Sequence, residues 1–151
     1  MTLSSKGTIF ICKFEGFKPK PYKDENGIWT IGYGTTYYPD DTRVQETDKA
    51  ISTDMARIYL THHINKSVVP SIISLSIPFS QTQFDALASF IYNIGMGHFE
   101  ASSLLISMKN RASNDIITTN FKKWNKAGGK ILPGLTTRRT AEANLYCNGI
   151  Y

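Results

Sequence analysis

The chain of 151 residues has the length of one domain, which is enough to bury a hydrophobic core of its own. Hydrophobic residues make up 41% and charged residues 19%, a balance that excludes disorder throughout the chain. No apolar run approaches the roughly 20 residues that cross a bilayer, and the polar N-terminus lacks the apolar stretch of a signal peptide. We therefore expect synthesis in the cytoplasm without an export signal, and no stable membrane anchoring.

The charge balance is basic, with 17 Lys and Arg against 12 Asp and Glu and a formal net charge of +5. Such a surplus attracts anionic polymers: nucleic acid, an anionic membrane surface or an acidic cell wall. The basic residues are scattered, and no zinc-finger spacing or RNP-type aromatic motif accompanies them, so we expect no nucleic-acid partner. The pair His62-His63 lacks further ligands nearby, so we expect no metal site.

The residue pattern in the first third of the chain predicts a short helix followed by a β-hairpin. Apolar side chains recur over residues 4–15 and predict a helix that stops at Gly16. Pro19 and Pro21 then predict an irregular connection. Asn26-Gly27, between two short runs of aromatic and β-branched residues, is a strong hairpin signal.

The remaining two thirds of the chain predict helices. The spacing of apolar residues over 53–73 predicts a long helix with Thr53 as its N-cap, which Pro70 ends or kinks. Further helices are predicted over residues 81–94, 102–108, 114–124 and 136–145, with a loop over 125–134. A small β element followed by helices predicts an α+β fold with segregated parts.

Three polar residues surround the predicted hairpin. Glu15 follows the first helix, Asp24 lies near the end of the first strand, and Thr30 lies in the second strand. Two carboxyl groups across a cleft suit the hydrolysis of a glycosidic bond, in which one is protonated and donates its proton while the other is ionised. The apolar residues near Glu15 in the sequence favour its protonated form, and the polar turn around Asp24 favours its ionised form. Spacing alone also fits a solvated Glu at a helix end and an Asp that caps a turn.

Residues 14–34 closely resemble the catalytic motif of the phage-type lysozymes (endolysins), glycoside hydrolase family 24. That motif has Glu, eight residues, Asp or Cys, five residues and Thr, and Glu15, Asp24 and Thr30 match it. Residues 83–95 resemble the family's central helical motif, and residues 124–142 resemble its C-terminal motif. The three motifs occur in the family's order and cover nearly the whole chain.

The resemblance implies a lysozyme-like α+β fold in one catalytic domain over residues 1–151. A small β-containing lobe would span residues 14–52, and a helix over 53–75 would connect it to a larger helical lobe. Residues 76–151 and the N-terminal helix, residues 3–13, would form the helical lobe. The active-site cleft would lie between the two lobes.

The resemblance also implies a peptidoglycan hydrolase, an endolysin that lyses bacteria. It would cleave the β-1,4 bond between N-acetylmuramic acid and N-acetylglucosamine, with Glu15 as the general acid. Asp24 would be the general base or stabilise the developing positive charge, and Thr30 would hold the attacking water. The family is described as inverting, which implies carboxyl groups roughly 6.5–9.5 Å apart.

Other positions of the family's motifs imply contacts with the glycan. These substrate-binding positions correspond to Thr36, Tyr92, Asn93, Ser102 or Ser103, and Arg138. Tyr92 also fits a core aromatic residue. Arg138 either meets a carboxylate of the peptide stem or pairs with Glu142 across one helical turn.

Two further features of the chain bear on the resemblance. Thr35 stands where relatives often have His, which puts an interlobe ion pair through that residue in doubt. The family's N-terminal helix is expected to pack against the C-terminal lobe, so Cys12 and Cys147 would approach each other. Both a disulfide and two buried free thiols remain open.

The resemblance implies peptidoglycan as substrate, a holin as the partner needed for release to the cell wall in the periplasm, no cofactor, and a monomer. A lytic transglycosylase would need only the acid, and the presence of Asp24 and Thr30 argues against it. A non-catalytic wall-binding module of the same fold would not need Glu15. A nucleic-acid-binding domain is the residual alternative, which a steep salt dependence of DNA affinity would support.

Overall fold

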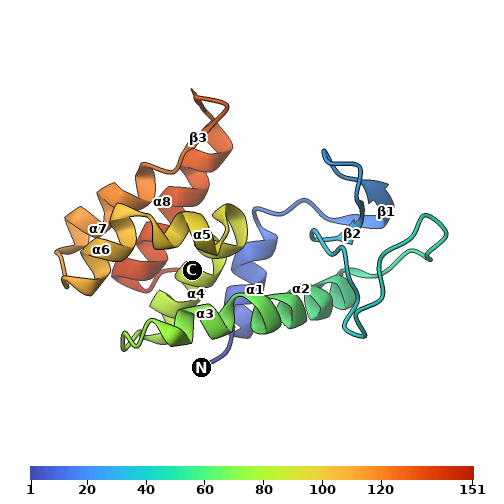
Figure 1. Ribbon diagram of the computed structural model, residues 1–151, viewed down its shortest axis with the longest axis horizontal. Helices are drawn as coiled ribbons and strands as arrows, with labels where there is room; N and C mark the ends of the chain where they lie inside the picture. The colour runs from blue at the N-terminus through green and yellow to red at the C-terminus, as the bar shows by residue number, and fades with distance from the viewer.

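A two-stranded β-sheet and a group of helices occupy opposite ends of the computed structural model, which describes residues 1–151 (Figure 1). The long helix α2, Thr53–Ser67, runs from the sheet toward the other helices (Figure 1). The remaining elements in chain order are α1 Ser5–Cys12, β1 Lys18–Lys23, β2 Trp29–Gly32, α3 Val69–Ser74, α4 Gln81–Ile94, α5 Met96–Glu100, α6 Ser103–Lys109, α7 Asn114–Lys122, β3 Lys126–Ala127, β4 Lys130–Ile131 and α8 Pro133–Asn148. The expected α+β arrangement of a small β-containing lobe and a larger helical lobe is confirmed.

Helix α1 begins as predicted but ends three residues earlier than expected. The Ser4 hydroxyl caps it by accepting from the amide of Gly7 at 3.0 Å. The amides of Phe14 and Glu15 both donate to the carbonyl of Ile11, at 3.0 and 3.2 Å. These bonds close the last turn, so the chain leaves the helix before the glycine that the sequence offered as a stop.

The hairpin predicted around Asn26-Gly27 is confirmed, but the irregular connection predicted from the two prolines is wrong. Pro19 and Pro21 lie inside β1, which pairs antiparallel with β2. The register is irregular between Lys18 and Tyr22, which is where both prolines fall. A proline lacks the amide hydrogen that a central strand needs, and a two-stranded sheet has only edge strands, where proline is tolerated.

The long helix predicted over residues 53–73 consists of two helices. Ser52, rather than the expected Thr53, is the N-cap of α2 and accepts from the amide of Met55 at 3.2 Å. Helix α2 ends at Ser67, and Pro70 lies in the first turn of α3. Proline suits a first helical turn because the missing amide hydrogen is not needed there, so Pro70 separates the two helices.

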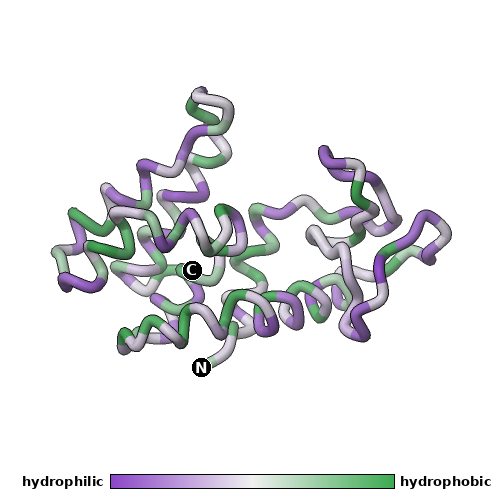
Figure 2. Tube along the Cα trace, viewed as in Figure 1, coloured by the Kyte–Doolittle hydropathy of each residue, from purple (hydrophilic) through white to green (hydrophobic).

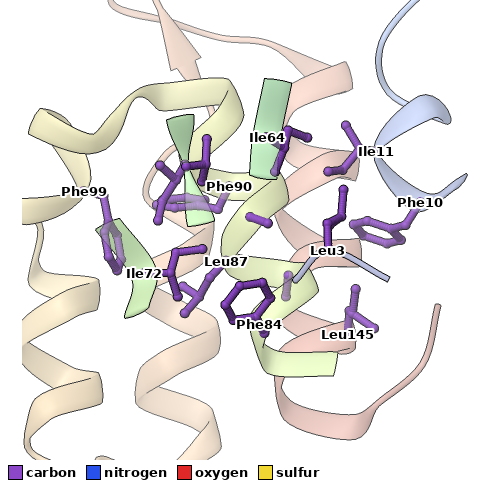
Figure 3. Packing of buried hydrophobic residues seen from close by; sticks show 14 of the residues in the cluster. Leu3, Phe10, Ile11, Ile64, Ile72, Phe84, Leu87, Phe90, Phe99 and Leu145 are labelled. Atoms are coloured by element: carbon purple, nitrogen blue, oxygen red, sulfur yellow. The ribbon is translucent and has the colours of Figure 1, made fainter. Parts of the chain in front are cut away.

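Helix α4 has the predicted bounds and forms the centre of the helical lobe. Ser80 and Gln83 form a reciprocal capping box at its start. All residues from Phe84 to Ile91 are buried. In Figure 3, side chains from α4 lie among residues of α1, α2 and α8; the labelled residues include Phe10, Ile11, Ile64, Leu87, Phe90 and Leu145. A helix buried on all sides places its polar residues inside the protein, where they require partners.

The C-terminal part differs from the prediction at several points, and α7 ends two residues earlier and α8 three residues later than expected. The short helix α5 was not predicted, and the loop expected over residues 125–134 contains the hairpin of β3 and β4, with Gly128 and Gly129 at φ of 55° and 77°. Helix α8 starts at Pro133, three residues before the expected start. A proline at the first helical position favours helix initiation, so Pro133 begins α8 instead of lying in the predicted loop.

Hydrophilic residues dominate the loops around the two-stranded sheet, whereas hydrophobic segments are more frequent among the helices (Figure 2). None of the helices combines the length and the apolar character that spanning a membrane requires.

The two cysteines are free thiols, so the disulfide that the sequence left open is not formed in the structure. The Cys147 thiol lies 3.7 Å from the carbonyl oxygen of Asn114. Burial raises the pKa of both thiols above the usual value, which favours the neutral, unreactive form.

Asp85, fully buried on α4, ties both ends of the chain to the centre of the helical lobe. Its carboxylate accepts from the Ser4 amide at 3.1 Å, the Gln81 side chain at 2.9 Å and the Tyr151 hydroxyl at 2.7 Å, and it also bonds the Ser4 hydroxyl. These bonds hold the carboxylate against Gly7, where an added Cβ would lie 2.5 Å from Asp85 Cγ.

Gly7→Ala therefore destabilises the protein, because Asp85 cannot move away without losing its hydrogen bonds. We expect a loss of about 1–3 kcal/mol in the free energy of unfolding, measured by urea denaturation. Gly134→Ala in α8 is the matched control, since nothing lies within 4 Å of its added Cβ. It should be neutral or slightly stabilising. Equal stability of the two variants would contradict the prediction.

Candidate active site

Glu15 lies three residues beyond α1, where the chain passes from the helical lobe to the sheet. Its side chain is 23% exposed, and its Oε1 accepts from Nη1 of Arg138 at 2.7 Å. The sequence predicted apolar surroundings for this carboxyl group, and this prediction was incomplete. A guanidinium group lies directly against it, contributed by a helix that begins more than one hundred residues later.

Several hydrogen bonds orient the Arg138 side chain that contacts Glu15. Its Nε donates to Glu142 at 3.0 Å and its Nη2 donates to the carbonyl of Ser89 at 3.1 Å. The guanidinium carbon also lies 5.5 Å from the centre of the Phe14 ring. Of the two predicted roles for Arg138, the structure confirms the pair with Glu142 across one helical turn. Only 4% of Arg138 is exposed, so its contacts are those of a buried support for Glu15.

Glu142 lies at the centre of this buried network. Its Oε1 accepts from the Ser89 hydroxyl at 2.6 Å as well as from Arg138, and its Oε2 accepts from Arg139 at 2.7 Å. Arg139 in turn donates to the side chain of Asn93. Burial raises the pKa of Glu142 although two arginines oppose the shift, and burial lowers the pKa of Arg139 to about 10.

Asp24 shapes the turn between β1 and β2. Its Oδ1 accepts from the amide of Asn26 at 2.8 Å and from the amide of Ile28 at 2.9 Å. These contacts are those of an Asx turn, so the turn-capping role that the sequence left open is present. The same contacts fix the carboxylate at the tip of the hairpin.

Thr30 is buried on β2 and bonds to the same short segment as Asp24. Its hydroxyl donates to the carbonyl of Ile28 at 3.0 Å, and that carbonyl also accepts from the amide of Asp24 at 3.0 Å. Both side chains are thus oriented by the backbone of Ile28. Because the hydroxyl donates its hydrogen bond to the carbonyl of Ile28, its oxygen lone pairs are available to accept another hydrogen bond.

Tyr92 joins the end of α4 to the segment that follows β2. Its hydroxyl donates to the carbonyl of Tyr33 at 3.0 Å, and a Cβ at Gly34 would lie only 2.8 Å from that hydroxyl. Burial, reinforced by the negative charge of Glu15, raises the pKa of Tyr92, so this phenol stays neutral. Tyr92 is half-buried, and its expected contact with substrate stays a prediction.

The other predicted substrate contacts are dispersed. Asn93 is exposed beside Tyr92, whereas Ser102 is buried and caps α6 by accepting from an amide at 3.2 Å. The Ser103 hydroxyl donates to Asn120 at 2.8 Å. Thr36 lines a hollow of about 670 Å³ in the β-containing lobe. Their roles in binding stay predictions, and no group of three or more metal-ligating side chains comes together.

Residues 12–142 match the family model described as phage lysozyme. The chain belongs to the phage lysozyme family. It is similar to the endolysin from Escherichia coli O157:H7 phage FAHEc1, with a TM-score of 0.85 and 33% identity over 100% of this chain and 96% of that one. A mutant of phage P22 lysozyme gives a TM-score of 0.84 and 32% identity over 97% and 98% of the two chains.

The endolysin of Bacillus phage PZA is 36% identical over 99% of this chain. The chain spans only 56% of the length of that relative. The similarity therefore covers about half of a longer relative in one case and nearly the whole of both solved chains in the others. The sequence motifs thus identified the family correctly.

The buried network should dominate the stability of the site. Glu142→Gln leaves Arg138 and Arg139 without their shared carboxylate, and we expect a loss of about 3–5 kcal/mol in the free energy of unfolding. Asp54→Asn breaks an exposed pair with Arg57 of 3.1 Å and should lose less than about 1 kcal/mol. Denaturant unfolding of both variants measures the difference. A loss for Glu142→Gln no larger than that for Asp54→Asn would contradict the prediction.

Proposed function

We propose that the protein is a peptidoglycan hydrolase that cleaves the β-1,4 bond between N-acetylmuramic acid and N-acetylglucosamine, and that it lyses bacterial cells as an endolysin does. Membership of the phage lysozyme family supports the reaction class. The observation that carries the assignment to this site is the placement of the motif residues. Glu15 is fixed at the junction of the two lobes, and Asp24 and Thr30 are fixed on the adjoining hairpin.

In the proposed reaction, Glu15 donates its proton to the glycosidic oxygen as the bond from the anomeric carbon breaks. The developing oxocarbenium ion is stabilised by the carboxylate of Asp24. The lone pairs of the Thr30 oxygen accept a hydrogen bond from the attacking water, and Asp24 takes the proton that this water loses. The products are two shortened glycan ends, with the water's oxygen on the new reducing end.

Three further polar side chains, two of them half-buried and one exposed, suit a glycan substrate. Thr36, Tyr92 and Asn93 provide hydroxyl and amide groups for hydrogen bonds with sugar hydroxyl and acetamido groups. The fixed position of Tyr92 against Gly34 gives a rigid edge for such contacts. We assign no substrate contact to Ser102, because it is buried and caps a helix.

Mass spectrometry of fragments released from purified peptidoglycan tests the reaction. The parent should release fragments with reducing muramic-acid ends, and Glu15→Gln should release none while remaining folded. Anhydro-muramic ends would instead identify a lytic transglycosylase. No fragments from the parent, on walls that a known lysozyme digests, would support a wall-binding module.

Asp24 combines a turn-forming role with a proposed catalytic role, and two variants separate them. Asp24→Asn keeps an oxygen that accepts from Asn26 and Ile28 but removes the charge, so we expect the parent's stability and a rate lower by about 10²–10⁴-fold. Asp24→Ala removes both and should also lower the thermal midpoint. Full activity of a folded Asp24→Asn would exclude Asp24 from the reaction.

A further inference from the structure

The basic surplus of the chain comes from one stretch near its C-terminus. Residues 116–141 contain six Lys and Arg and no Asp or Glu. The rest of the chain has 11 basic against 12 acidic side chains, so this stretch accounts for the whole surplus. Arg138 and Arg139 are buried and paired with Glu142, which leaves the lysines of the stretch to present positive charge at the surface.

Two of these lysines lie on the hairpin of β3 and β4, which is exposed along its whole length. Lys126 pairs with Ile131 across the hairpin, and Ala127 pairs with Lys130. All of residues 126–134 are exposed, and neither lysine takes part in an ion pair. Opposite residues share a face and neighbours alternate, so Lys126 lies beside the exposed Ile131 on one face and Lys130 lies on the other. The hairpin is thus a basic surface without a partner in the protein.

The base of this hairpin is fixed to the helix that supports Glu15. Asn125, just before β3, donates to the hydroxyl of Thr136 near the start of α8 at 3.1 Å. Helix α8 begins at Pro133, and Arg138, which contacts Glu15, lies five residues further on. At 1.5 Å of rise per residue, the hairpin and this arginine are separated by about 7.5 Å along the helix axis.

The β3–β4 hairpin and the β1–β2 hairpin project on the same side of the molecule, one from each lobe (Figure 1). The segment that joins α1 to β1 runs between the two lobes (Figure 1). Glu15 lies on that segment, and Asp24 lies in the turn between β1 and β2. A glycan bound at these two residues would therefore have the β3–β4 hairpin on the side of the helical lobe.

The inference rests on the proposed function, which determines where the peptide stem of the substrate begins. The bond proposed to break is that of the anomeric carbon of N-acetylmuramic acid, so this sugar lies against Glu15 and Asp24. The stem is attached to the same sugar and leaves the glycan next to these residues. The glycan itself is uncharged, whereas the stem carries free carboxylates and small apolar side chains.

We propose that the β3–β4 hairpin binds the peptide stem of the muramic acid, and that Lys126 and Lys130 pair with the carboxylates of the stem. The resemblance offered Arg138 for such a carboxylate, but Arg138 is 4% exposed and its guanidinium group already bonds Glu15 and Glu142. The two lysines are exposed, carry the complementary charge and sit on an arm that is fixed relative to the acid.

An anionic lipid surface fits this hairpin less well than the stem does. The hairpin and its flanks carry two exposed apolar residues, Ile131 and Leu132, and no aromatic residue. Segments that lie in a membrane interface combine basic residues with a larger apolar face. The nearest aromatic side chain in the sequence, Trp124, is half-buried and packs against Phe90 at 6.0 Å between ring centres.

Kinetics on two forms of one substrate test the proposal. Soluble, uncross-linked peptidoglycan strands are compared with the same strands after conversion of their carboxyl groups to methylamides, which removes the negative charge and keeps the stem. The double variant Lys126→Gln/Lys130→Gln should raise KM on untreated strands by about three- to tenfold with kcat unchanged. It should cleave the methylamide strands as the parent does.

The matched control is Lys49→Gln/Lys109→Gln, which removes two exposed lysines from other parts of the chain. It should behave like the parent on both forms of the strands, and circular dichroism checks that both double variants are folded. An equal rise of KM on untreated and methylamide strands would overturn the proposal. So would a rise in the control as large as that in the hairpin variant, because the effect would then follow net charge alone.

Binding measured in a Glu15→Gln background separates this inference from the proposed function. Calorimetry should show tighter binding of untreated than of methylamide strands, and the difference should disappear when Lys126 and Lys130 are also replaced. That result supports the hairpin contact even where the parent hydrolyses nothing, in which case only the proposed function fails. Equal binding of both forms would overturn the proposal. Lysine-dependent binding to phosphatidylglycerol vesicles, with strand binding unchanged by the two substitutions, would overturn it in favour of a membrane surface.

Discussion

The ion pair between Glu15 and Arg138 is the contact on which the arrangement of this site depends. It joins the segment that follows α1 to the buried face of α8, which are 123 residues apart in the sequence. Arg138 can hold Glu15 only because Glu142 and Ser89 fix the rest of its guanidinium group. The position of the Glu15 carboxyl group thus depends on the helical lobe, although Glu15 itself lies on the segment that leads to the sheet.

The positions of Asp24 and Thr30 depend instead on hydrogen bonds within the hairpin. Asp24 and Thr30 both bond to the backbone of Ile28, so a few residues of one hairpin orient both side chains. This difference explains why the sequence was informative about the hairpin. Its turn signal, the spacing of the three motif residues and the position of Asp24 at the strand end all depend on short-range geometry.

The sequence also gave reliable bounds for α4, because its caps and its apolar residues agree with each other. It did not predict that Pro19 and Pro21 lie within a strand, since proline is tolerated there only because the sheet has two strands. The contact between Arg138 and Glu15 was missed for another reason. The pattern of α8 predicts pairing with Glu142 inside the helix, but only packing of the whole lobe brings Glu15 to the free side of that arginine.

Burying two arginines and a glutamate beside an apolar core carries a large desolvation cost for the support of one side chain. Replacing such groups by hydrophobic residues often leaves stability unchanged or improves it. A hydrophobic residue at Arg138 could fill the same space but could not bond Glu15, Glu142 and Ser89 at defined angles. The network is therefore better explained by the fixed orientation that it gives the Glu15 side chain than by stability. On this argument, sequences that keep the fold without cleaving glycans would have no physical reason to retain Arg138 and Glu142 together.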